Sequence, residues 1–171
     1  MSFINFFGLE VKAVKRILSL TILILILTTA VCFAAPDTVS PYEEGNATDL
    51  IAVTNPQGQR DTTFDGSYVI SGYGKEGTVI TVYWHDAEAD LYKKVYNEVK
   101  YTSSNGTVTT ALEEASVTVG TSGLFMRSVD LSQGDHNLLI RAENGGSVQH
   151  LKISLTRYKR NLINIIKSWA N

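Results

Sequence analysis

The chain has 171 residues, a mass of 18.8 kDa and a formal net charge of −2 at pH 7. Its hydrophobic fraction of 44% is that of an ordinary globular protein and excludes a collagen-like or low-complexity chain. A single cysteine excludes an intramolecular disulfide and a cysteine-based zinc cluster, and the near-neutral charge argues against a dedicated nucleic-acid binder, which needs a basic surface.

The beginning of the chain has the three parts of a secretory signal peptide. Three cationic side chains precede an apolar run at 17–27, and small residues follow up to Ala34. This order predicts a leader over residues 1–34 that is cleaved after Ala34, which places the mature chain outside the cytoplasm, secreted or at the cell surface. The alternative is a retained membrane anchor, because the apolar stretch 17–35 is about as long as the shortest transmembrane helices.

Residues 35–48 have the composition of a linker. They include two of the three prolines of the chain together with acidic residues and a glycine. A segment of this kind has few apolar side chains to bury and few residues that favour regular structure. The sequence therefore predicts a flexible, extended linker between the leader and the folded domain.

Residues 49–158 show the period of two that is typical of β-strands. Within 78–85, for example, Ile80 and Val82 face one way and Tyr83 faces the other. Short runs rich in Val, Ile, Thr and Tyr alternate with glycine, asparagine and aspartate clusters that suit hairpin turns. Eight strands at this spacing predict an all-β sandwich or barrel of antiparallel strands. The expected strands are 50–55, 67–73, 78–85, 93–102, 116–119, 124–131, 137–143 and 148–156.

Two glycine-containing patterns stand within residues 63–144. The first is V-I-S-G at 69–72 followed by G-T-V at 77–79. The second is G-x-F-x3-V-x-L-x2-G-x2-N-x4-A, followed by an N-G-G turn, and it is formed by Gly123, Phe125, Val129, Leu131, Gly134, Asn137 and Ala142. With these patterns the chain resembles bacterial immunoglobulin-like domains of secreted and surface proteins. The resemblance implies a two-sheet sandwich of about seven or eight strands that spaces or binds partners without catalytic residues. Residues 86–114 depart from it as a longer insertion.

The sequence shows no pattern of reactive groups. The three histidines lie in different expected strands or turns, and no nucleophile, metalloprotease or phosphate-loop motif accompanies them. Asp86, Glu88 and Asp90 have the spacing that begins a calcium loop, but the glycine and the later glutamate of such a loop are missing, which favours a soluble hairpin end. We therefore expect no enzyme, no metal site and no cofactor.

Four tyrosines cluster in or beside the insertion: Tyr83, Tyr92, Tyr96 and Tyr101. Flat aromatic faces that are exposed and contiguous can stack on sugar rings. The cluster therefore offers a candidate platform for a carbohydrate, which makes a carbohydrate-binding module one alternative function. Trp84 shares the parity of the apolar residues of its strand and is expected in the core. The partner class expected for the domain is a protein or a cell-wall polysaccharide at the cell surface, with no nucleic acid.

The period changes again in residues 159–171, which predict a short amphipathic helix. Its apolar face consists of Leu162, Ile165, Ile166 and Trp169. Arg160 and Lys167 contribute to a net charge of +4 over 157–171, whereas residues 35–156 have a net charge of −8. A basic amphipathic helix can contact an anionic membrane or a partner, so a membrane-associated envelope protein is the second alternative function. The same helix can instead fold back onto its own acidic sandwich, since so short a helix is marginal without packing.

Overall fold

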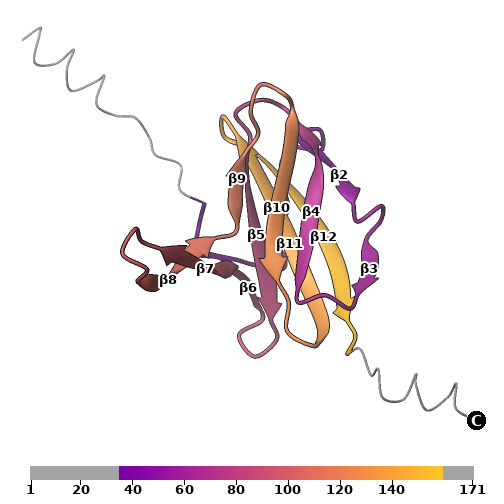
Figure 1. The fold of residues 1–171 in the computed structure, drawn as a ribbon. Helices are drawn as coiled ribbons and strands as arrows, with labels where there is room; N and C mark the ends of the chain where they lie inside the picture. The colour runs from indigo at the N-terminus through magenta and orange to yellow at the C-terminus, as the bar shows by residue number, and fades with distance from the viewer. Residues whose placement is uncertain (1–34, 160–171) are drawn as a thin grey trace, which may run out of the picture. The chain divides into compact units, whose positions relative to one another are not determined.

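The computed structural model describes residues 35–159 (Figure 1). Within this part of the chain there are twelve strands and no helix, which confirms the all-β prediction. The strands form antiparallel sheets consistent with a β-sandwich. The expected leader over 1–34 and residues 160–171 of the expected C-terminal helix lie outside the described residues. Residues 35–159 contain no helix that is long and apolar enough to cross a membrane.

The larger sheet has two long central strands, β5 and β11, that pair with each other. Its order is β1-β6-β5-β11-β12-β3, with β9 pairing the first half of β5. All of these pairs are antiparallel except β3 with β12, which are parallel. The bounds are β1 Thr38–Val39, β3 Arg60–Thr63, β5 Val79–Asp86, β6 Leu91–Lys94, β9 Ser116–Thr118, β11 Gly134–Asn144 and β12 Ser147–Arg157.

The smaller sheet has three strands in the order β10-β4-β2, with bounds β2 Ile51–Asn55, β4 Ser67–Gly74 and β10 Leu124–Asp130. The apolar side chains of the two sheets form one buried cluster, in which Ile80 and Ile140 of the larger sheet join Ile70 and Phe125 of the smaller one. Alternating strands of this kind bury one face and leave the other wet, as the period of two predicts. A two-stranded hairpin, β7 (Tyr96–Thr102) with β8 (Val108–Glu114), forms a third unit.

β6 and β9 behave as one strand beside β5 that is interrupted by this hairpin. Val95 follows β6 and Ala115 precedes β9, and both bond to Val82 in the middle of β5: the Val82 N–H donates to the Ala115 carbonyl and the Val95 N–H donates to the Val82 carbonyl, both at 2.9 Å. The chain therefore leaves the sheet at Val95 and returns at Ala115. A single strand over 93–102 is wrong for this reason, and the insertion proper is the hairpin rather than the whole of 86–114.

Within the expected linker 35–48, residues 36–43 pack along the outer face of the larger sheet, so this part is not the flexible segment that buries little. Val39 is fully buried in a small cluster that includes Tyr83 and Leu139. β1 pairs with β6, and the Tyr83 hydroxyl donates a hydrogen bond of 2.8 Å to the carbonyl of Pro36. The physical reason is that β5 and β11 are apolar on both faces near these residues, so the outer face also needs a cover.

Candidate functional site

The four tyrosines of the candidate carbohydrate platform do not share an exposed face. Tyr83 is fully buried and Tyr92 is 6% exposed, and both lie in the cluster covered by Val39. Burial raises the pKa of both phenols. Tyr96 and Tyr101 are about half exposed, but they lie five positions apart on β7 and therefore on opposite faces of the hairpin. The structure brings only Tyr83 and Tyr92 together, and it brings them together as packing residues.

The acidic turn between β5 and β6 is stabilised by its own residues. Asp86 accepts hydrogen bonds from the backbone N–H groups of Glu88 and Ala89, and it forms an ion pair with Lys93. The hydrogen bond from Lys93 is the main cause that lowers the pKa of the Asp86 carboxyl. Asp90 bonds to His85 at 3.1 Å and accepts a hydrogen bond of 3.3 Å from the Tyr42 hydroxyl. No group of three or more His, Cys, Asp or Glu side chains able to hold a metal ion occurs among residues 35–159.

The three histidines take part in separate packing contacts, and His85 and His136 line one surface hollow with Trp84. His85 contacts Asp90 and the ring of Tyr92. His136 stacks on Trp84 with 5.6 Å between the ring centroids. The Nδ1–H of His150 donates a hydrogen bond of 3.0 Å to the carbonyl of Glu43, since a carbonyl oxygen can only accept. These contacts give each histidine a structural neighbour, although the buried Nε2 of His150 has no hydrogen-bond partner within residues 35–159.

The β7–β8 hairpin is fixed at its base to the free edge of β10. The Asn97 side chain is buried and donates to the carbonyl of Ser128 at 2.7 Å, while it accepts from the N–H of Asp130 at 3.2 Å. Arg127 of β10 adds a hydrogen bond of 2.6 Å to the carbonyl of Glu114. These side chains satisfy main-chain groups that would otherwise leave β10 as an open edge strand.

Beyond its base the hairpin extends away from the sandwich (Figure 1). The register pairs Glu98 with Leu112, so one face of the hairpin holds Tyr96, Leu112 and Val108, with exposed fractions of 47%, 66% and 58%. Exposed apolar side chains of this kind on a projecting element are a common feature of contact surfaces. Apart from the base, this face has no cover within the described part of the chain.

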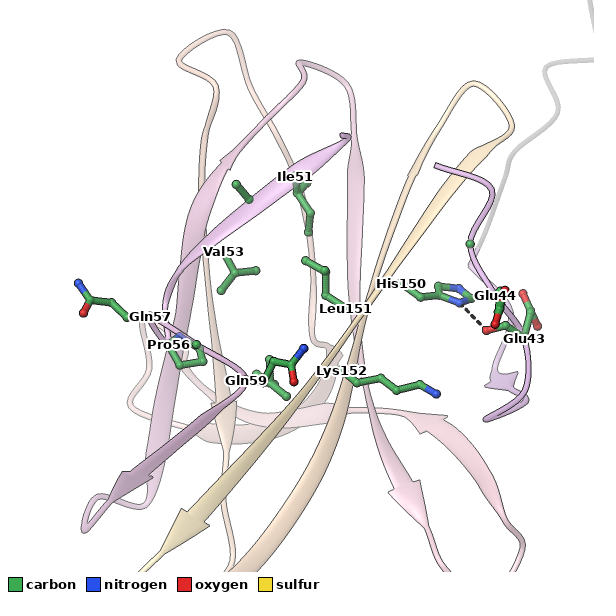
Figure 2. Close-up of a pocket in the computed structure, with 14 residues that line it drawn as sticks. Glu43, Glu44, Ile51, Val53, Pro56, Gln57, Gln59, His150, Leu151 and Lys152 are labelled. Atoms are coloured by element: carbon green, nitrogen blue, oxygen red, sulfur yellow. Dashed lines mark hydrogen bonds between the residues drawn. The ribbon is translucent and has the colours of Figure 1, made fainter. Parts of the chain in front are cut away.

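A groove of about 600 Å³ separates β2 from β12, where the chain passes from β2 in the smaller sheet to β3 in the larger one (Figure 2). At one end of the groove, Gln149 of β12 joins the two strands: its side-chain Oε1 accepts from the N–H groups of Leu50 and Ile51 at 2.8 and 2.9 Å, and Nε2 donates to the Ile51 carbonyl at 3.1 Å. At the other end, the Ser154 N–H donates to the Gln59 carbonyl at 2.7 Å.

The two sides of β12 present different chemistry along this groove. Leu151 points toward Ile51 and Val53 on one side of the strand (Figure 2). On the other side, His150 and Lys152 lie toward the segment that holds Glu43 and Glu44, together with Pro41, whose carbonyl accepts 2.8 Å from Lys152 Nζ. The groove is therefore apolar on the core side of the edge and charged on the outer side.

Neither the groove nor the hairpin anchor was a candidate site in the sequence. The alternation of 148–156 predicts that Leu151 faces the core and Lys152 faces outward, and both predictions are confirmed. The alternation does not show which strand lies next to β12, because the neighbour of β12 depends on where the chain crosses between the sheets. The membrane or partner contact expected for Leu162, Ile165, Ile166, Trp169, Arg160 and Lys167 lies outside the described residues.

Comparison with known proteins found no matching family, no matching curated protein and no matching solved structure. The resemblance to bacterial immunoglobulin-like domains therefore stays a prediction from the sequence.

Proposed function

We propose that the mature chain is a non-catalytic, immunoglobulin-like module, exported to the bacterial cell surface, that binds or spaces a partner there. The observation that carries this proposal is the strand order. The order β2-β4-β10 in one sheet and β5-β11-β12 in the other is the order expected for strands A-B-E and C-F-G of an immunoglobulin-type sandwich, and this agreement supports the proposal. Modules of this type present edges and loops on a rigid two-sheet scaffold.

A non-catalytic role is supported by the work that the polar side chains already perform. Asp86 holds a turn, His136 packs on Trp84, Asn97 holds the hairpin and Gln149 joins the two sheets. Each of these groups has a structural partner, whereas a catalytic group has to face a reacting atom. The exposed face of the β7–β8 hairpin and the groove beside β12 remain as surfaces for contact with a partner.

Export is supported by the place where the fold begins. The Pro36 carbonyl and the side chain of Val39 are already part of the sandwich, so cleavage after Ala34 removes the predicted leader and keeps every described contact from Pro36 onward. We therefore expect a mature chain that starts at Ala35.

The test is to express the whole chain with its own beginning in a bacterial host, to sequence the N-terminus of the product and to measure its sensitivity to protease added to intact cells. The proposal predicts a chain starting at Ala35 outside the cytoplasmic membrane, with an Ala34→Glu variant that is not cleaved. A full-length chain that stays in the cytoplasm would overturn the proposal.

Partner class is tested on cells of the source organism with the purified mature chain. Binding that protease pretreatment of the cells abolishes indicates a surface protein, and binding that survives protease but is lost after cell-wall hydrolysis indicates a polysaccharide. Binding to anionic liposomes that is lost when residues 160–171 are deleted indicates the membrane-associated alternative. No saturable binding to cells, envelopes or liposomes would refute a binding role and leave only the spacer role.

A further inference from the structure

The edge of β12 has an open stretch between two places where it is paired. At one end the N–H and carbonyl of Val148 bond to Asn46 and Ala47, and at the other β3 pairs with β12 from Ser154 to Arg157. Within the described part of the chain, no strand pairs with this edge between them. We propose that this stretch accepts an extended segment of a partner protein, with alternating apolar and basic side chains, as an added strand. This inference rests on the proposed binding role and specifies the chemistry of the partner.

The main-chain groups of the open stretch point in the required direction. Along an antiparallel strand the N–H and C=O of successive residues point alternately to the two sides. Val148 and Ser154 bond outward, away from β11, and the register between β11 and β12 is continuous over this range. His150 and Lys152 lie two and four positions after Val148, so their main-chain groups also point outward. Gly45 lies against the His150 N–H, where a Cβ built on it would stand 3.0 Å from the nitrogen, so the unobstructed part of the edge is centred on Lys152. A partner strand can pair with these groups, as in other cases of strand addition to a sheet edge.

The side chains around the stretch define what the added strand has to carry. Its successive side chains would point to opposite faces. One set meets the apolar surface of Ile51, Val53 and Leu151, which favours Val, Ile or Leu. The other set meets the outer side, where Glu43 and Glu44 are exposed and make no ion pair with any described residue.

The charges of the outer side favour a basic segment. Among the residues that line the groove, the two carboxylates outnumber the single ammonium group of Lys152, whose Nζ is already bonded to the Pro41 carbonyl. Arg60 lies beside Lys152 just outside the groove, so the excess negative charge belongs to the end that holds Glu43 and Glu44. A lysine or arginine at alternate positions of the added strand would meet this excess negative charge, while an acidic strand would be repelled. A competing occupant is the basic C-terminal segment 160–171 of the chain itself, and the experiment separates the two.

The probe is a capped heptapeptide of alternating valine and lysine, titrated into the whole mature chain and followed by backbone amide NMR. We expect saturable binding with shifts at His150 and Lys152, and much weaker binding of the matching valine–glutamate peptide. Lys152→Pro removes the outward N–H without touching the ladder to β11, and Lys152→Ala is its matched control, because both variants lose the same side chain. Proline is tolerated at an edge position of this kind.

The expected result is a loss of about tenfold or more in affinity for Lys152→Pro and none for Lys152→Ala, since the loss of a main-chain hydrogen bond is worth about this factor. Glu43→Gln and Glu44→Gln should each weaken binding by about threefold, as expected for exposed charge pairs. If Lys152→Pro does not fold, peptides methylated on backbone nitrogens replace it. Methylation on the side that faces β12 should abolish binding, and methylation on the other side should preserve it.

Four results would overturn the inference: no binding of the valine–lysine peptide, equal binding of the two peptides, equal affinities of the two Lys152 variants or insensitivity to methylation. An increase in affinity of about tenfold or more after deletion of 160–171 would also overturn it, because the native occupant would then be the chain's own end. A chain that fails these tests but still binds cells refutes this site and leaves the proposed function intact. A chain that binds neither peptide nor cells refutes both.

Discussion

Gln149 provides the sharpest prediction on stability, because one side chain replaces strand pairing at the place where the two sheets meet. It is 5% exposed and bonds to two N–H groups and one carbonyl of Leu50 and Ile51, which are themselves buried. Gln149→Met keeps the length of the side chain and removes all three hydrogen bonds. A buried main-chain group without a partner costs about 1–3 kcal/mol, so the variant should lose about 3 kcal/mol or more of the free energy of unfolding.

The assay is equilibrium unfolding of the mature chain in urea, followed by far-ultraviolet circular dichroism. The matched control is Gln133→Met, the same substitution at an exposed position, which should stay within about 0.5 kcal/mol of the parent. A loss of less than about 1 kcal/mol for Gln149→Met would refute the reasoning, since it would mean that the three main-chain groups find other partners.

Three further predictions concern the sheets, the hairpin and acid stability. Gly72→Ala should lower the thermal unfolding midpoint, because its Cβ would stand 2.1 Å from the Ala52 carbonyl oxygen and the strands would have to separate. Asn97→Ala should speed amide hydrogen exchange throughout the β7–β8 hairpin while the exchange of β11 stays slow. The hydrogen bond from Tyr68 lowers the pKa of the Asp61 carboxyl below its ordinary value of 3.8, so it stabilises the fold at neutral pH, and this stabilisation is lost as the pH falls through the folded-state pKa. Urea unfolding at neutral and acid pH should therefore show a smaller acid loss in Tyr68→Phe than in the parent, and an equal loss in both would contradict this.

The strands that were predictable are those in which the local pattern alone decides the outcome. In 67–73 and 124–131 the alternation is regular and the bounding glycines suit the turns, and Gly123 does adopt a positive φ of 70°. β8 was not predicted, because its residues are mostly polar and it pairs only with β7. β1 and β3 were missed because their few residues lack an alternating pattern. They become strands only by pairing with an edge that the rest of the fold supplies.

The candidate site was less predictable because burial on the outer face of a sheet is a non-local property. The alternation correctly places Tyr83 opposite to Ile80 and Val82, but it cannot show that the segment around Val39 returns to cover that face. The tyrosine platform fails for this reason. Similarly, the sequence indicates an insertion, but the points of departure and return depend on the pairing of Val95 and Ala115 with β5.

Amide hydrogen exchange of the whole mature chain, resolved residue by residue along β12, tests the central claim of an open edge most directly. The structure predicts slow exchange for Val148 and Ser154, whose N–H groups are bonded to Asn46 and Gln59, and fast exchange for Lys152, which becomes slow when the valine–lysine peptide is added. Exchange at Lys152 as slow as at Ser154 in the free chain would contradict the account, because this stretch of the edge would already be covered.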